Sequence, residues 1–213
     1  MRTDDLLDLL STGVAPVKRG AAARRFGLAV PLAYIGSLLL MLAVYGLRPD
    51  LASVAHTAIF WEKLAFPTCV AIGSLIATTR LARPGARVGA GWPIMALGPL
   101  AVWIAGILIV AAAAPGERLA IVLGHTWHSC PFNILLLSIP AFAAIFWAVR
   151  GLAPTRLRQA GAVSGLLASS LGTLAYSLHC PEMSPAFWGV WYLLGMLLPA
   201  IIGALLGPRL LRW

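Results

Sequence analysis

The sequence predicts an all-α integral membrane protein with six transmembrane helices and both termini in the cytoplasm. Hydrophobic residues make up 60% of the chain, charged residues only 11%, and the mean hydropathy is +0.88. Soluble globular domains do not have this composition. In lipid every backbone polar group must be bonded within the segment itself, and a helix of about 20 apolar residues meets that need.

Six apolar stretches reach that length and define an expected transmembrane domain over residues 26–208. Their bounds are about 26–47, 60–79, 92–114, 132–149, 160–178 and 187–206. None of them alternates apolar and polar residues with a period of two, so no strand is expected. Residues 1–25 form an N-terminal segment before this domain, and residues 209–213 form a short tail after it.

The basic residues set the expected orientation, because short loops rich in Lys and Arg remain in the cytoplasm. Of the 16 Lys and Arg residues, 13 fall on the N-terminal side of the six crossings and 3 fall opposite. The 13 are Arg2, Lys18, Arg19, Arg24, Arg25, Arg80, Arg83, Arg87, Arg150, Arg156, Arg158, Arg209 and Arg212. The 3 are Arg48, Lys63 and Arg118. Lys63 is expected to extend its ammonium group to the membrane surface.

These basic clusters stand directly beside predicted membrane segments. They are therefore expected to face the anionic headgroups of the lipid bilayer, and direct nucleic-acid binding is not expected. Small residues also recur at a spacing of four in the last two segments, which predicts close contact between helices. They are Gly161, Gly165, Ser169, Gly195, Gly203 and Gly207.

Two Cys-Pro steps lie at outer edges of predicted membrane segments. The residues of the two motifs are His128, Cys130, Pro131, His179, Cys180, Pro181 and Glu182. Thiolates bind soft metals and form disulfides, and neutral imidazole is a common co-ligand, so the motifs suit a sensor, a metal site or a disulfide. They equally suit a structural role, in which small buried Cys residues end helices beside Pro.

The N-terminal segment predicts a short amphipathic helix. Thr3 can cap it, and Asp4 and Asp5 lie at the positive end of its dipole. Its apolar stripe consists of Leu6, Leu7, Leu10 and Val14. Acidic residues beside leucines favour a groove on a partner protein over anionic lipid, although such a helix can also pack beneath the bundle.

Five stretches carry a resemblance to a known family: residues 1–6, 130–135, 176–182, 184–185 and 191–192. On them the chain resembles, over nearly its whole length, the NrsF-type membrane anti-sigma factors. These are negative regulators of extracytoplasmic-function sigma factors of the sigma-F kind. The resemblance implies a multi-pass protein of the bacterial inner membrane that sequesters such a sigma factor. A periplasmic metal or redox stress signal would release it.

The resemblance also implies roles for particular residues. Cys130 and Cys180 would sense the signal, with His179 and Glu182 in the same motif and His128 in a more variable stretch. No cofactor is obligatory, although a heavy-metal ion can occupy the cysteine pair transiently. Sigma binding is expected on Asp4, Asp5, Leu6, Leu7 and Leu10.

Two other classes of function fit the sequence less well. A small metal-ion or solute transporter could use the same Cys and His ligands, but it needs polar partners through the midplane, where mainly Ser, Thr and Asn133 are found. An enzyme is not expected, because the chain lacks HExxH, GxSxG and Walker signatures and places none of its seven acidic residues centrally in a segment. The sequence does not indicate an oligomeric state.

Overall fold

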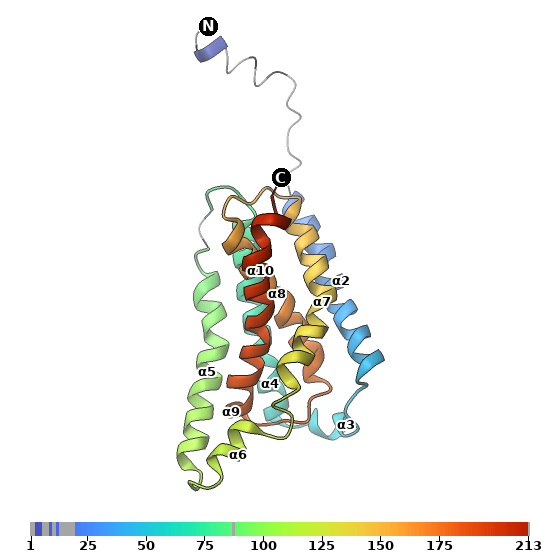
Figure 1. Ribbon diagram of the computed structural model, residues 1–213, viewed down its shortest axis with the longest axis vertical. Helices are drawn as coiled ribbons and strands as arrows, with labels where there is room; N and C mark the ends of the chain where they lie inside the picture. The colour runs from blue at the N-terminus through green and yellow to red at the C-terminus, as the bar shows by residue number, and fades with distance from the viewer. Residues whose placement is uncertain (1–2, 6–8, 10–11, 13–19, 87, 213) are drawn as a thin grey trace.

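The computed structural model describes residues 3–5, 9, 12, 20–86 and 88–212, and within these ranges all regular structure is helical. Six long helices run along the long axis of the molecule (Figure 1). They are α2 (Ala21–Val44), α4 (Ala58–Leu81), α5 (Gly91–Ala112), α7 (Cys130–Arg150), α8 (Leu157–Ser177) and α10 (Leu193–Leu210). Shorter elements connect them: α3 (Leu51–Val54), α6 (Arg118–Leu123), α9 (Pro185–Phe187) and the π-helical turn η1 (Trp188–Tyr192).

The all-helical fold class is confirmed, and the six long helices occupy the six predicted stretches. Among the described residues, five helical segments are long and apolar enough to cross a membrane. They are Ala21–Val44, Ala58–Leu81, Gly91–Ala112, Cys130–Arg150 and Pro185–Leu210. The helix that does not reach this hydropathy is α8, which has the length of its neighbours but is rich in Gly, Ser and Thr.

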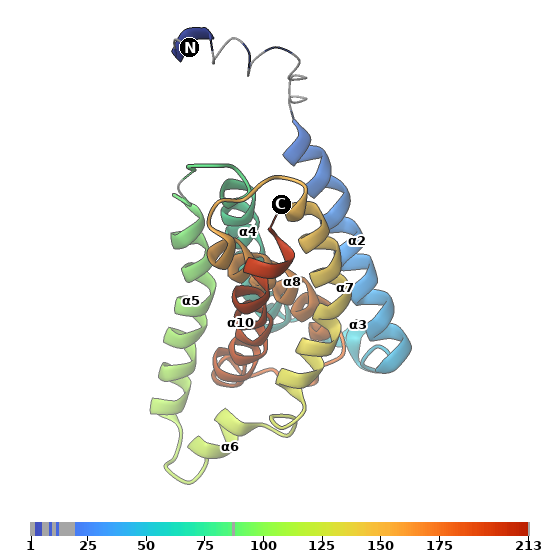
Figure 2. The same cartoon turned by 45° about the horizontal axis from the view of Figure 1, so that its top comes forward.

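The helix α8 forms the centre of the bundle. It contacts α10, α7, α4 and α2, and these surround it in the tilted view (Figure 2). Most of its residues are buried. The hydroxyls of its buried Ser and Thr residues donate to carbonyls three or four residues earlier in the same helix, as seen for Ser164, Thr173 and Ser177. Because α8 faces other helices and not lipid, it needs less hydropathy than they do.

Glycine lets α8 and α10 approach until their backbones touch. A Cβ on Gly161 would overlap the carbonyl of Gly203, and a Cβ on Gly165 would overlap the carbonyl of Pro199. The hydroxyl of Ser169 donates to the Met196 carbonyl of α10 at 2.9 Å. The close helix contact predicted from the small residues is therefore confirmed for this pair.

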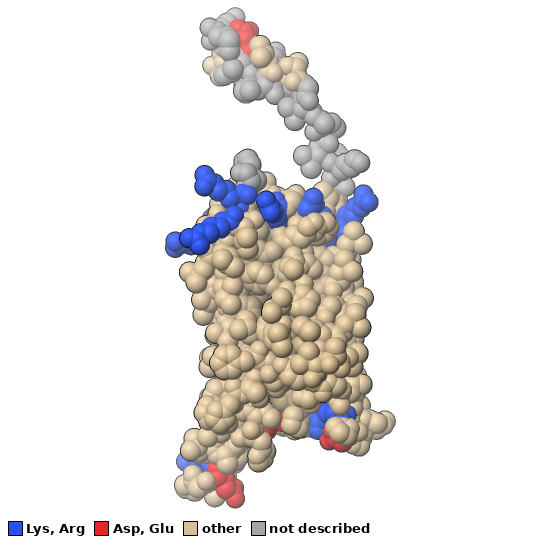
Figure 3. All heavy atoms as spheres, turned by 45° about the vertical axis from the view of Figure 1, so that its right-hand side comes forward, with Lys and Arg blue, Asp and Glu red and all other residues tan. Residues whose placement is uncertain are grey.

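The two ends of the bundle differ in charge. Figure 3 shows Lys and Arg gathered at one end, an uncharged band over the middle, and a few charges of both signs at the other end. We name the first the basic end; α2 begins there and α10 ends there (Figure 1). Its described basic residues are Arg24, Arg25, Arg80, Arg83, Arg150, Arg156, Arg158, Arg209 and Arg212. The opposite end, with α3, α6 and α9, is named the cysteine end.

Candidate sensory site at the cysteine end

Both Cys-Pro steps stand at helix ends. Cys130 is the first residue of α7, and its N–H donates to the Thr126 carbonyl at 3.0 Å. Pro131 lies in the first turn, where a missing N–H leaves no helical bond unmade. Cys180 follows the end of α8, and its N–H donates to the Tyr176 carbonyl at 3.0 Å. Pro181 then prevents the helix from continuing.

The fold brings the two cysteines into one buried cluster. Both are free thiols with no exposed surface, and both belong to one cluster of packed, buried side chains. The cluster also contains the large buried side chains of Tyr176, Phe187 and Tyr192. Cys69, the third cysteine, lies midway along α4 and is partly exposed. The cysteines of the two Cys-Pro steps therefore lie in one buried cluster of aromatic and aliphatic side chains.

The two histidines of the motifs lie differently. His179 turns toward the chain after α2: its Nδ1 lies 3.1 Å from the Gly46 carbonyl, and its ring lies 5.2 Å from the ring of Tyr45. A carbonyl only accepts hydrogen bonds, so this nitrogen carries the proton. His128 is exposed and stacks on Trp127 at 3.5 Å between ring centroids. The structure thus does not bring His128 into the cysteine cluster.

A metal at this site would have few protein donors. In the described part of the chain, no group of three or more His, Cys, Asp or Glu side chains is arranged to hold a metal ion. The donors that the fold does bring together are the two thiols of Cys130 and Cys180. Two thiolates suit a soft metal ion that arrives as a signal, not a hard cation that needs many oxygen ligands.

Glu182 orders the loop between α6 and α7. Its Oε1 accepts hydrogen bonds from the N–H groups of His125, at 2.7 Å, and Thr126, at 3.1 Å, and from the Thr126 hydroxyl at 3.3 Å. Gly124 begins this loop with a φ of 58°, and a Cβ there would meet the Glu182 carboxylate and the Phe187 ring. Glu182 therefore positions the chain that leads into Cys130.

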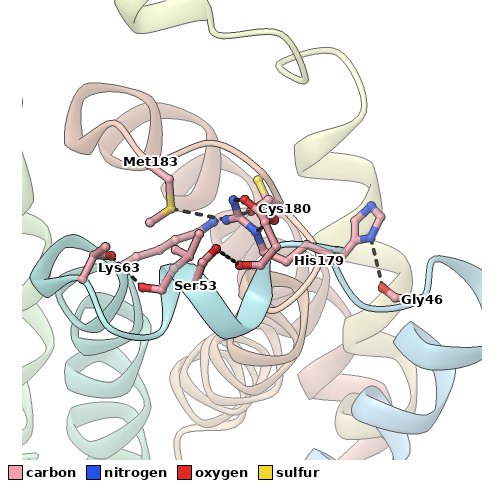
Figure 4. Close-up of polar contacts among 10 residues, drawn as sticks. Gly46, Ser53, Lys63, His179, Cys180 and Met183 are labelled. Carbon is pink, nitrogen blue, oxygen red and sulfur yellow. Dashed lines mark hydrogen bonds and ion pairs between the residues drawn. The ribbon is translucent and has the colours of Figure 1, made fainter.

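Two cations contact the carbonyl of Cys180, and the sequence did not reveal them. Lys63 is completely buried, and its Nζ donates to this oxygen at 2.6 Å. Nη1 of Arg48, from the loop after α2, donates to the same oxygen at 3.2 Å (Figure 4). The expectation that Lys63 reaches the membrane surface was wrong, because its side chain turns inward to the Cys180 carbonyl and has no exposed surface, whereas the adjacent Glu62 is exposed. One sequence feature singled them out: both are among the three basic residues on the cysteine side of the charge distribution.

Arg48 is oriented by a carboxylate. Its Nε and Nη2 donate to the two oxygens of Asp50, each at 2.7 Å, in a bidentate pair. This hydrogen bonding raises the pKa of the Arg48 guanidinium and lowers the pKa of the exposed Asp50 carboxyl. The pair fixes the direction in which the remaining Arg48 nitrogen meets Cys180.

The predicted sigma-binding residues lie mainly outside the described part of the chain. Residues 3–5 are helical and exposed, and they include Asp4 and Asp5. Leu6, Leu7 and Leu10 fall outside the described residues. Their role stays a prediction.

The fold and the site together define a helical membrane-type protein with a thiol cluster at one end and a basic face at the other. Residues 10–213 match the protein family described as NrsF, negative regulator of sigma F. The chain is 45% identical over 215 residues to a probable anti-sigma-F factor NrsF of Azospira oryzae, with all of both chains covered. It is 38% identical, again over both full lengths, to the anti-sigma-F factor NrsF of Caulobacter vibrioides. No solved structure matches the chain. The chain belongs to the NrsF family of negative regulators of sigma F.

Proposed function

We propose that the protein sequesters an extracytoplasmic-function sigma factor at its basic end and releases it when the thiols at its cysteine end react. Membership of the NrsF family supports a sigma factor as the partner. The observation that carries the sensing half is the burial of Cys130 and Cys180 in one cluster, at the end opposite the basic residues. Signal and output would then lie on opposite sides of one membrane.

The proposed orientation places the basic end in the cytoplasm and the cysteine end in the periplasm of a bacterial inner membrane. The gathering of Arg residues at one end supports it, since cytoplasmic loops carry the excess of Lys and Arg. We include α8 as a sixth crossing. It is as long as α7, and its neighbours shield its hydroxyl groups from lipid. An even number of crossings then leaves both termini in the cytoplasm.

The proposed signal is a thiol-reactive species in the periplasm. A two-electron oxidant would join the two sulfurs in a disulfide, taking up two electrons while two protons leave. A soft divalent metal ion would instead displace both thiol protons and bind both thiolates. Either product changes the packing around Cys180, the residue on which Lys63 and Arg48 converge. The site thus links its chemistry to the neighbouring helices.

The first experiment locates the sigma-binding surface. A tagged sigma factor is co-expressed with the full chain, with a chain lacking residues 2–20, and with a Leu6→Ser/Leu10→Ser double variant. Leu9→Ser is the matched control, because Leu9 lies off the predicted apolar stripe. We expect the sigma factor to copurify with membranes that contain the full chain or the control, and not with the other two. Equal recovery with the truncated chain would overturn this placement.

The second experiment tests sensing. Membranes that hold the complex are treated with diamide, a thiol oxidant, or with Cd²⁺, and the released sigma factor is measured. We expect release from the unmodified protein and from Cys69→Ser, but not from a Cys130→Ser/Cys180→Ser double variant. Release of equal extent from the double variant would exclude these two thiols as the sensor.

A further inference from the structure

The burial of Lys63 without a carboxylate partner is unusual for a charged side chain. Its side chain has no exposed surface, and among the described residues the ion pair of this region joins Arg48 to Asp50 and does not include Lys63. The contacts of the ammonium group are the Cys180 carbonyl at 2.6 Å and the face of the Tyr192 ring, 5.8 Å away. Burying a charge is costly, and an apolar side chain of similar volume often packs as well. Stability alone therefore gives little reason for a lysine here.

Arg48 reaches the same carbonyl from another part of the fold. Besides its bond to the Cys180 oxygen, its Nη1 lies 3.4 Å from the Met183 sulfur, and its backbone N–H donates to the Leu178 carbonyl at 3.3 Å. One oxygen atom thus accepts from a residue that follows α2 and from a residue within α4 (Figure 4).

From this geometry we propose that Lys63 and Arg48 form a two-cation clamp on the Cys180 carbonyl, and that this clamp couples the cysteine site to α2 and α4. The proposal rests on the proposed function, because it concerns how the same site controls sigma binding. Both cations are positioning residues: they hold the turn that carries the thiol and do not react themselves.

The clamp connects the thiol to the opposite end of the molecule through α2. The carbonyl and the sulfur belong to one residue, so a disulfide or a metal at the sulfur that reorients Cys180 also moves the oxygen. Arg48 is four residues beyond Val44, the last residue of α2, and α2 runs unbroken from there to Ala21 over about 36 Å. His179 adds a second tie, because its ring contacts the Gly46 carbonyl. Displacement of the Cys180 turn is therefore transmitted to the helix that follows the N-terminal segment.

The clamp defines two states of the protein, one with both cations bonded to the Cys180 carbonyl and one with these bonds broken. With the clamp made, Cys180 is buried and the sigma-holding state is favoured. With the clamp broken, α2 and α4 lose their shared attachment. A coupling of the size usual between two sites changes an affinity by about 5-fold to 150-fold. Variants that break the clamp should therefore lower sigma retention by at least about fivefold in the absence of any inducer.

The test compares Lys63 variants in the copurification assay without inducer. Lys63→Met removes the charge and the donor, Lys63→Gln removes only the charge, and Lys63→Arg keeps both. Glu62→Gln is the matched control, because Glu62 is the adjacent residue of α4 and is exposed. We expect low retention for Lys63→Met, partial retention for Lys63→Gln, and recovery for Lys63→Arg and Glu62→Gln.

A second position keeps the proposal testable if Lys63→Met does not fold. Arg48→Met removes the other cation from a loop, with Arg118→Met as the control at the same end of the molecule. We expect Arg48→Met to lower retention and to make the remaining complex release sigma at a lower diamide concentration. If folded Lys63 and Arg48 variants retain sigma and respond like the unmodified protein, the clamp is overturned while the proposed function stands. If the unmodified protein itself retains no sigma factor, both proposals fail.

Discussion

The hydroxyl of Tyr45 donates a hydrogen bond of 2.9 Å to the Oδ1 atom of Asn133, which joins the end of α2 to the first turn of α7. The Tyr45 ring also packs beside the rings of His179 and Tyr176, at 5.2 and 6.5 Å between centroids. Three long helices therefore meet around one tyrosine next to the Cys180 turn. A hydrogen bond thus adds to ring packing where the three helices meet.

Replacing Tyr45 with Phe should separate this hydrogen bond from the packing of the ring. We expect Tyr45→Phe to lower the free energy of unfolding by about 1 kcal/mol, since Asn133 loses a donor while the ring remains. Tyr34→Phe is the control on the same helix, because the structure records no hydrogen bond from the Tyr34 hydroxyl to another described residue. Unfolding of both variants in detergent is the measurement, and equal stability of the two would contradict the prediction.

Glu182→Gln should loosen the loop between α6 and α7. The carboxylate accepts from two backbone N–H groups, and a hydrogen bond to a charged group contributes about 1.5–3 kcal/mol. We expect the His125 and Thr126 amides to exchange with deuterium about tenfold faster, or more, than in the unmodified protein. Glu117→Gln, at an exposed position before α6, serves as the control. Unchanged exchange at both amides would show that the loop stays ordered without the Glu182 carboxylate.

Gly161→Leu should disrupt the packing of α8 against α10. Its side chain would overlap the Gly203 carbonyl, and relief requires the two backbones to separate. Overpacking costs about 1–3 kcal/mol where side chains can move, and we expect at least the upper value here. Gly27→Leu is the matched control, because a Cβ on Gly27 meets no atom within 4 Å. The thermal unfolding temperatures of the two variants in detergent test this, and similar temperatures would argue against tight packing.

The Arg48–Asp50 pair should make the cysteine end sensitive to acid. The hydrogen bond from Arg48 lowers the pKa of Asp50 below its ordinary value of 3.8. A group with a lowered folded-state pKa stabilises the fold above its ordinary pKa, and this contribution is lost as the pH falls through the lowered value. We therefore expect Asp50→Asn to be less stable than the unmodified protein at pH 7. The difference should disappear as the pH falls below the lowered pKa.

The measurement is thermal unfolding of both proteins in detergent over a pH series, with Asp4→Asn, at an exposed position in the N-terminal segment, as a control. A stability difference that does not change with pH would mean that the Asp50 carboxylate is not the titrating group. Because Asp50 is exposed, the effect should also shrink as the salt concentration rises.

The position of each long helix could be predicted from composition, because lipid requires about 20 apolar residues in each crossing. Composition did not predict that α8 lies at the centre of the bundle, where its Ser and Thr hydroxyls bond within the helix and its Gly residues touch α10. A helix at the centre of a bundle meets other helices instead of lipid. The hydropathy of such a helix therefore does not indicate where it lies in the bundle.

For the candidate site, too, some features follow from the sequence and others only from the tertiary structure. The sequence by itself determined that Cys130 and Cys180 stand beside prolines at helix ends on one side of the charge asymmetry. Only the tertiary structure decided that the two thiols share a buried cluster, that His128 stays outside it, and that Lys63 turns inward to the Cys180 carbonyl. Charge counts and apolar periods are local properties that the chain carries along its length. The direction of a lysine side chain depends instead on which carbonyl the packing of α2, α4 and α8 places within reach of it.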